Sequence, residues 1–235
     1  MARQLPKYLT ASLLVVGALA PGCRRPPKPT VAPVPQPVLA APRAPAAPPE
    51  LPLFAPRVLA PLAVDGELAE TVWRDAAHSG GFADETTGKL GVPHSELRIA
   101  NDGQRVLLGL YAADEDIVAY ATKGAPFDAR DDTFVVQFER AGSNAGYQLE
   151  VTANGTVRES PADPAAVGAV CAVEMDGTLN VPADDDEEWV AECIIPFASM
   201  HATIGDTLLV TARRCDTPKG ATRRCGTWQR RVQLQ

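Results

Sequence analysis

The 235-residue sequence predicts an all-β domain, an antiparallel β-sandwich, over residues 63–235. Three observations predict this fold class. Six to eight short segments rich in β-branched and aromatic residues recur at regular spacing, turn residues separate them, and few segments show the apolar period of a helix. A segment of this length is enough for one domain with its own hydrophobic core.

Residues 1–22 predict a lipoprotein signal peptide. Arg3 and Lys7 precede an apolar run of about a dozen residues, which is too short for a bilayer because a spanning helix needs roughly 20. The small residues before Cys23 resemble a bacterial lipobox, which implies cleavage there and a diacylglycerol on the sulfur of Cys23. No acidic residue follows Cys23, and by resemblance to envelope lipoproteins this favours the outer membrane. An ordinary secretory signal is the alternative.

Residues 23–62 predict a linker. Behind Cys23 the segment is mainly Pro, Ala and Val, and repeated prolines disfavour helices and remove the N–H donors that a sheet needs. Such a chain forms an extended polyproline spacer of about 3.1 Å per residue. We expect the spacer to hold the domain clear of a membrane. A proline-rich ligand for a partner protein is the alternative.

Each expected strand lies between turn residues. Residues 96–114 predict two strands around an Asn-Asp-Gly turn, and Asn154-Gly155 is the favoured pair for a two-residue type I′ hairpin turn. Short helices are expected within 67–76 and 197–200. The other expected strands are TFVVQFE (133–139), YQLEVTA (147–153), TVRE (156–159), GAVCAVEM (168–175), EWVAECIIPF (188–197), DTLLVTARRC (206–215) and VQLQ (232–235).

The four cysteines behind the linker predict two disulfides. Opposed residues in an antiparallel pair have a constant index sum, so Cys171 opposite Cys193 places their loop near residues 180–184, where turn residues occur. Cys215 and Cys225 likewise bracket a segment with Pro and Gly. We therefore expect bridges within these two pairs, as in an oxidising compartment. Four reduced thiols are the alternative.

Motifs for catalysis are largely missing from the sequence. It has no GxSxG, SxxK, HExxH, Walker loop, CxxC or CxxCH, and its three histidines lack metal-ligand spacing. Acids are abundant enough to leave a glycosidase-type carboxylate pair open. The run DDDEE (184–188) predicts a solvated loop, with a calcium ligand set as the alternative. The net charge of −7 opposes binding to nucleic acid.

Several motifs, in order, resemble carbohydrate-binding modules of family 9, which are DOMON-like sandwiches. VDGELAETVW (64–73) resembles the opening of that family, RDDTFVVQFE (130–139) its Asp-Ser-Val-Glu-Ile-Phe strand, and EWVAECIIPF (188–197) its strand that ends in Ile-Pro-Phe. The resemblance covers nearly the whole domain. It implies a β-sandwich that binds sugars, often beside glycosidase domains, and that can carry structural calcium.

The resemblance also implies a sugar clamp of two aromatic rings. Phe127 lies near the position of one clamping tryptophan, and Trp228 matches the other, with core packing as the alternative for Trp228. Val135 stands where the family has a carboxylate, so one hydrogen bond to a sugar hydroxyl is lost. Trp73 and Trp189 lie in periodic apolar segments and are expected in the core.

Four aspartates predict a calcium site. Asp114 and Asp116 close one expected strand, and Asp131 and Asp132 open a nearby one. Carboxylates that converge from two loops suit Ca²⁺, which takes about six to eight oxygen ligands. Solvated loop caps are the alternative.

The leading interpretation is a lipid-anchored protein of the bacterial outer membrane that binds carbohydrate without catalysis and serves carbohydrate catabolism with partner glycosidases. One alternative is a glycoside hydrolase or an accessory subunit of one. Another is a structural sandwich that binds a second envelope protein through a sheet edge or charged loops. A third is a haem-binding sandwich, with iron ligands from Met175, Met200 or His201.

Overall fold

The computed structural model describes residues 50–91, 93–140, 146–160 and 168–235. The predicted signal peptide, Cys23 and the linker up to residue 49 lie outside the described residues. The chain from Pro48 to Gln235 forms one compact unit. Within the described part of the chain, no helix is both long and apolar enough to cross a bilayer.

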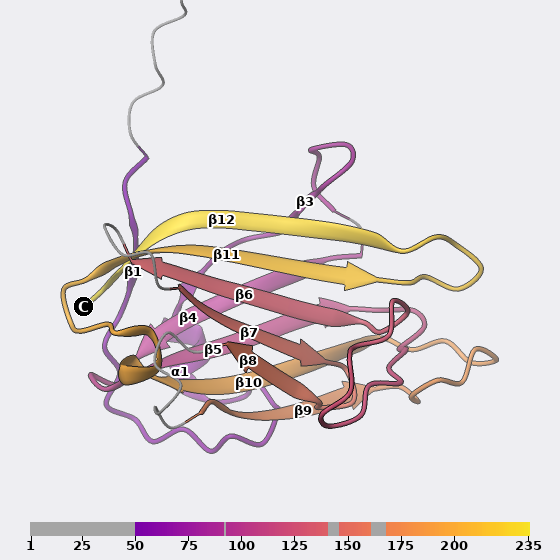
Figure 1. The fold of residues 1–235 in the computed structure, drawn as a ribbon, viewed down its shortest axis with the longest axis horizontal. Helices are drawn as coiled ribbons and strands as arrows, with labels where there is room; N and C mark the ends of the chain where they lie inside the picture. Colours follow the sequence, from indigo (N-terminus) through magenta and orange to yellow (C-terminus); the bar gives the residue numbers. More distant parts are fainter. Residues whose placement is uncertain (1–49, 92, 141–145, 161–167) are drawn as a thin grey trace, which may run out of the picture. The chain divides into compact units, whose positions relative to one another are not determined.

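The compact unit is a β-sandwich of two sheets (Figure 1). The seven-stranded sheet has the order β1-β12-β11-β6-β7-β8, with β3 also paired to β12, and the five-stranded sheet has the order β2-β4-β5-β10-β9. Every pairing is antiparallel except that of β1 with β12. The strands are β1 (Leu53–Ala55), β2 (Ala77–His78), β3 (Ala83–Asp84), β4 (Ser95–Asn101), β5 (Arg105–Ala113), β6 (Thr133–Arg140), β7 (Gly146–Thr152), β8 (Val157–Ser160), β9 (Val170–Asp176), β10 (Glu188–Pro196), β11 (Thr207–Asp216) and β12 (Arg224–Leu234). The predicted all-β sandwich is confirmed.

Strand β6 shows how the alternating sequence produces the sandwich. Phe134, Val136 and Phe138 are buried in the interior, whereas the intervening Val135 and Gln137 lie on the outer side of the sheet. Burial of each large apolar side chain contributes about 1.5–3 kcal/mol relative to exposure. The same alternation in the other strands fills the space between the sheets.

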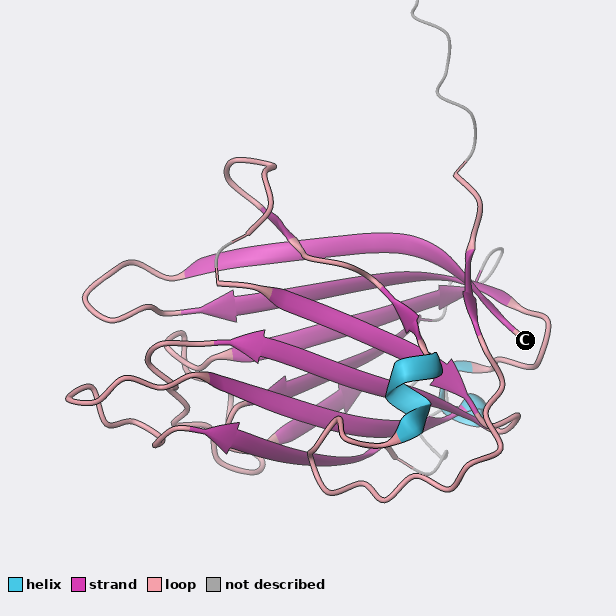
Figure 2. Cartoon of the chain, turned by 180° about the vertical axis from the view of Figure 1, so that it is seen from behind, coloured by secondary structure: helices cyan, strands magenta, loops and turns pink. Residues whose placement is uncertain are grey.

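The predicted core tryptophans pack on different sides of the five-stranded sheet. Trp189 of β10 lies between the sheets, with its ring centroid 5.1 Å from that of Phe134. Trp73 belongs to the short helix α1 (Thr71–Asp75) and is buried against Ala100 and Leu107 on the outer side. Figure 2 shows α1 over this sheet. A 3-10 helix, η1 (Phe197–Met200), follows β10, so both predicted short helices are present.

Both predicted disulfides are present. Cys171 and Cys193 stand directly opposite each other in β9 and β10, and Cys215 and Cys225 in β11 and β12. The index-sum argument therefore gave the correct pairing, because each bridge joins the two strands of one hairpin.

The turn between β7 and β8 differs from the predicted two-residue type. The loop comprises residues 153–155, and the Gly155 N–H donates to the Thr152 carbonyl at 2.9 Å. Gly155 has a φ of 78°, but Asn154 is not among the described residues with positive φ, as a type I′ turn requires at both central positions. The turn is the three-residue kind, with glycine in the left-handed conformation.

The folded unit begins before the predicted boundary at residue 63. Strand β1 pairs in parallel with the end of β12, with Leu53 opposite Val232 and Ala55 opposite Leu234, and Ala55 is fully buried. The composition predicted a linker here. However, a short extended segment can pair with the free edge of the last strand, where neighbouring prolines are tolerated.

Candidate functional site

The two residues of the predicted sugar clamp lie far apart. Trp228 lies in β12 opposite Ala212 and packs half-buried against the main core. Phe127 lies in the loop before β6, under the guanidinium of Arg158 from β8, 4.8 Å from the ring centroid. Three strands separate β12 from β8 in the sheet, which at about 4.8 Å per strand is about 19 Å. The structure therefore does not bring the two rings of the predicted clamp together, and Trp228 packs against the core, as the alternative had it.

The phase of the strand explains this error. Trp228 lies on the same side of β12 as the buried Val232 and Leu234, so its neighbours Thr227 and Gln229 face outward. A shift of one residue moves a side chain to the other face of a sheet. A match that is one residue out of phase therefore selected a core residue instead of a surface residue.

The outer side of the seven-stranded sheet carries a connected set of polar side chains. The Gln137 Nε2 donates to Gln148 Oε1 at 2.7 Å, and the Gln148 Nε2 donates to Glu150 Oε1 at 2.6 Å. Arg158 Nη1 lies 3.3 Å from Glu150 Oε2. We call Gln137, Gln148, Glu150, Arg158 and Arg213 the polar face. It extends over β6, β7, β8 and β11.

The polar face surrounds the position of the missing family carboxylate. Val135 stands opposite Glu150 on one side and Arg213 on the other. Glu150 thus supplies a carboxylate one strand away from Val135. Arg213 forms a bidentate pair with Glu85, through bonds of 2.6 and 2.9 Å. A cavity of about 100 Å³ opens beside Glu150 and Arg158.

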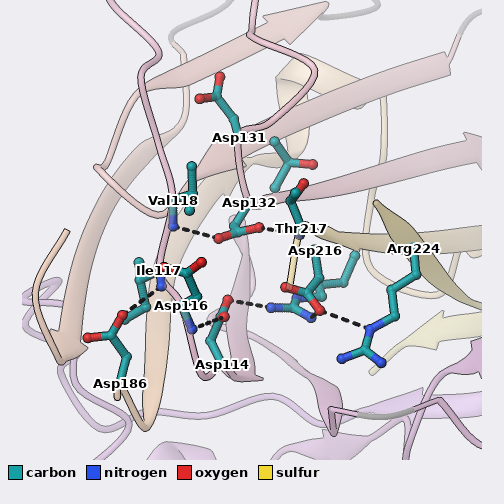
Figure 3. Close-up of polar contacts among 12 residues, drawn as sticks. Asp114, Asp116, Ile117, Val118, Asp131, Asp132, Asp186, Asp216, Thr217 and Arg224 are labelled. Atoms are coloured by element: carbon teal, nitrogen blue, oxygen red, sulfur yellow. Dashed lines mark hydrogen bonds and ion pairs between the residues drawn. The ribbon is translucent and has the colours of Figure 1, made fainter. Parts of the chain in front are cut away.

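A second polar cluster lies buried at the end of the sandwich (Figure 3). Asp114, Asp132 and Asp216 place their carboxylate oxygens within 4.8 Å of one another, and each residue is at most 2% exposed. Arg214, itself 3% exposed, donates to Asp114 through Nη2 at 2.5 Å and lies 3.3 Å from Asp216 through Nη1. We call these four residues the aspartate–arginine cluster.

Only two of the four predicted calcium ligands join this cluster. Asp131 instead accepts the N–H groups of Tyr120 and Asp128, at 2.5 and 2.7 Å, and so caps its own loop. Asp116 lies outside the cluster. Of the predicted set, Asp114 and Asp132 therefore lie together with Asp216, whereas Asp116 and Asp131 lie outside this group, and calcium binding itself stays a prediction.

Strand phase could have found Asp216 and Arg214. The inward side of β11 runs through Val210 and Ala212, and the next inward positions are Arg214 and Asp216. A charged residue that continues an apolar, inward-facing series must meet an oppositely charged partner or a hydrogen-bond donor. The sequence analysis treated this end of the chain only as a basic surface.

Burial governs the protonation of the cluster. Removal from water, together with the nearby Asp114 carboxylate, raises the pKa of Asp132 to about 8. Burial also raises the pKa of Asp114 to about 6, although the Arg214 guanidinium opposes that shift. The two Asp132 oxygens accept the N–H groups of Val118 and Thr217, at 2.7 and 3.0 Å.

The carboxylate oxygens of this cluster are the type of ligand atom that a hard cation binds. Oxygen ligands are those that Ca²⁺ prefers, and Asp216 Oδ1 has no hydrogen-bond partner among the described residues. Arg214 already supplies one positive charge between Asp114 and Asp216. An ion here would therefore share the carboxylates with a guanidinium.

A buried glutamate explains why two of the family-like motifs occur together. Glu192 accepts the Trp73 Nε1–H through Oε1 at 2.5 Å, and its Oε2 accepts the N–H groups of Asp65 and Gly66 at 3.0 and 3.1 Å. Gly66 has a φ of 100°, and a Cβ there would lie 2.7 Å from the Glu174 nitrogen. The Val-Asp-Gly and Trp-x-x-Glu segments are therefore structural, because they hold α1 and its loop on the sheet.

The structure separates the candidate haem ligands. Met175 stands opposite Trp189 near the start of β10, whereas Met200 and His201 follow the end of that strand. The acidic run 184–188 is only partly a solvated loop. Asp186 is buried and accepts the N–H groups of Ile117 and Thr178.

No protein-family model and no curated protein sequence matches the chain. Among solved structures, the chain is similar to a putative carbohydrate-binding protein from Bacteroides uniformis, with a TM-score of 0.58 and 16% identity over 76% of this chain and 89% of that one. It is also similar to a family 9 carbohydrate-binding module from Caldicellulosiruptor kristjanssonii in complex with cellotriose, with a TM-score of 0.56 and 11% identity over 79% and 94% of the two chains. A glucose complex of a family 9 module from that organism gives a TM-score of 0.54 at 11% identity over 77% and 95%. These likenesses confirm, at the level of the fold, the resemblance to family 9 carbohydrate-binding modules.

Proposed function

We propose that this protein binds carbohydrate, without catalysis, on the polar face of its seven-stranded sheet. The observation that carries the proposal is the connected series of amide, carboxylate and guanidinium groups around Val135. Such groups donate to and accept from sugar hydroxyls, which need partners when water is displaced. The modules of like fold that hold cellotriose and glucose support the ligand class.

Glu150 is the residue on which this proposal depends most. It faces outward and pairs with Gln148 and Arg158. It also supplies a carboxylate directly opposite Val135, which occupies the position where family 9 modules have one. The Phe127 ring beside Arg158 adds an apolar surface for the face of a sugar ring. A contact of this kind contributes about 1 kcal/mol beyond area burial, so we expect affinities in the micromolar to millimolar range.

Calorimetry with cellotriose and glucose tests the proposal on the full chain. Glu150→Gln keeps the size of the side chain but removes the charge, and we expect about tenfold weaker binding, equivalent to about 1.4 kcal/mol. Glu139→Gln is the matched control, because Glu139 is an exposed residue of β6 outside the polar face. Equal affinities for the two variants, or no binding of either sugar, would overturn the proposal.

We also propose that Cys23 carries a lipid that anchors the protein to the outer membrane, where partner glycosidases act on the bound carbohydrate. The apolar run that ends in a small residue before Cys23 supports this proposal. Cys23→Ser should abolish palmitate labelling and release the protein from membrane fractions. A variant that still labels and sediments with membranes would contradict the anchor.

Finally, we propose that the aspartate–arginine cluster binds calcium as a structural ion. The free Asp216 Oδ1 beside Asp114 and Asp132 supports this proposal. Melting curves in millimolar calcium and in chelator test it. A melting temperature that is equal in both would overturn this proposal.

A further inference from the structure

A cavity of about 200 Å³ opens at the end of the sandwich, away from the polar face. Three loops form its wall, residues 114–132, 177–187 and 217–223, and Figure 1 shows them at the same end of the two sheets. We call it the loop-end cavity. Its lining includes Tyr120, Pro182 and Pro218, whose rings offer apolar surface, together with the acidic Asp116 and the basic Arg130.

The wall of the loop-end cavity is held together by side-chain bonds between the loops. The Asn180 amide exchanges two hydrogen bonds of 2.9 Å with the backbone of Ala119, which joins the first two loops. The Thr217 N–H donates to Asp132, which joins the first and third loops. The Cys215–Cys225 disulfide closes the base of the third loop. The cavity is therefore preformed, as ligand sites usually are.

Asp116 is the unusual feature of this cavity. It is only 7% exposed, yet no hydrogen bond or ion pair from the described residues reaches its carboxylate. Its backbone N–H alone is used, as a donor to Asp114. A carboxylate this deeply buried needs donors, and a ligand that displaces the cavity water must supply them.

The charge around the loop-end cavity indicates which kind of hydrogen-bond donor a ligand would bring to Asp116. The three loops contain ten acidic and four basic residues. On the third loop, the Lys219 Nζ donates to the Asp184 carbonyl at 3.2 Å and lies 3.8 Å from Asp185 Oδ1. The charges that act on Asp116 are those of the Lys219 ammonium and of the carboxylates of Asp186, Asp216 and Asp184. A cationic donor suits this surrounding better than a neutral hydroxyl.

We propose that the loop-end cavity is a second ligand site, for a sugar-sized ring that carries a primary ammonium group, with Asp116 as its counter-ion. Tyr120, which is 47% exposed, and the two proline rings contact the apolar edges of the ligand ring. Arg130 covers one side of the Tyr120 ring, 4.4 Å from the centroid, and forms a bidentate pair with Asp128. The site is independent of the polar face.

Amide NMR of the full chain, titrated with glucosamine and with glucose, tests this proposal. We expect shifts at Tyr120 and Thr217 with glucosamine, and about tenfold or more weaker binding of glucose at these residues. Asp116→Asn, which keeps the size, should reduce the glucosamine affinity about tenfold or more. Glu139→Gln, at an exposed residue outside both sites, should leave the glucosamine affinity measured at Tyr120 and Thr217 unchanged.

A second variant tests the proposal even if Asp116→Asn does not fold. Tyr120→Ala changes an exposed side chain, so it should weaken glucosamine binding while the melting temperature stays the same. Equal binding of glucosamine and glucose at the cavity would overturn the proposal. So would glucosamine shifts confined to the polar face, or an affinity that neither variant changes.

Discussion

Arg213 and Arg214 are neighbours in β11, but they lie in opposite surroundings. Arg213 faces outward and pairs with Glu85 on the exposed side of the sheet. Arg214 faces inward, is 3% exposed, and balances the carboxylates of Asp114 and Asp216. Two residues of identical chemistry therefore lie on the proposed binding face and in the buried cluster respectively, and only the phase of the strand distinguishes them.

This comparison indicates which charged residues can be substituted at little cost to folding and which cannot. Side chains of the polar face can be exchanged at little cost to folding, because solvent-exposed ion pairs contribute about 0.2–1 kcal/mol. Removal of one partner from a buried pair leaves an uncompensated charge and costs about 3–5 kcal/mol. The aspartate–arginine cluster also holds the loops that form the loop-end cavity, since Asp132 binds Val118 and Thr217.

Substitution of the two arginines tests the comparison with the largest expected effect. Arg214→Gln should lower the free energy of unfolding by about 3–5 kcal/mol at neutral pH, because Asp114 loses its buried counter-charge and Asp216 keeps only the partly exposed Arg224. Arg213→Gln, one residue away, should lower it by less than about 1 kcal/mol. Urea denaturation of both variants measures the difference. Similar losses for the two would contradict the opposite placement of these side chains.

Trp228→Ala should have the next largest effect on stability. The ring packs half-buried against the main core, so we expect a loss of about 2 kcal/mol, below the roughly 3–5 kcal/mol of a fully buried aromatic residue. Carbohydrate affinity should not change, because Trp228 faces the interior. Calorimetry that finds weaker sugar binding at unchanged stability would restore the predicted clamp.

The dependence of stability on pH sharpens the account of the buried acids. The pKa of Asp132, about 8, and that of Glu192, about 7, lie above the ordinary values, so the native state holds protons that the unfolded state releases. The melting temperature should therefore fall as the pH rises from about 5 to 8. Asp132→Asn should reduce this slope, and bound calcium would do the same by stabilising the ionised carboxylates. A melting temperature that rises over this range would contradict the assignment.

The variant with the smallest expected effect on stability should still weaken carbohydrate binding. Arg213→Gln removes an outward donor beside Val135 and Glu150, and we expect cellotriose to bind about tenfold more weakly. Arg231→Gln is the matched control, because Arg231 lies on the outer side of β12, two strands from β6. Equal affinities of the two variants for cellotriose would remove Arg213 from the site.

Local chemistry in the sequence predicted most of the fold and less of the site. The strands follow from alternation and turn residues, and the bridges of Cys171 and Cys215 follow from the register of two hairpins. Strand β1 could not be predicted, because its pairing with Val232 joins residues almost 180 positions apart in the chain. Composition alone described that segment as a linker.

The errors at the site have a different physical origin. Motif matching located the segments around Trp228 and Asp131 but not the face that each side chain occupies. Counting alternate residues from a buried neighbour places Trp228 in the interior, separates Asp132 from Asp131, and identifies Arg214. The remaining feature, the contact of Glu150 with Arg158, depends on register between strands and required the structure.

Amide NMR of the full chain with cellotriose tests the central claim most directly. The claim is that carbohydrate binds to the polar face on β6, β7, β8 and β11. We predict shifts centred on Gln137, Glu150 and Arg213, with little change at Trp228. Shifts centred on Trp228, or no shift at millimolar cellotriose, would contradict the account.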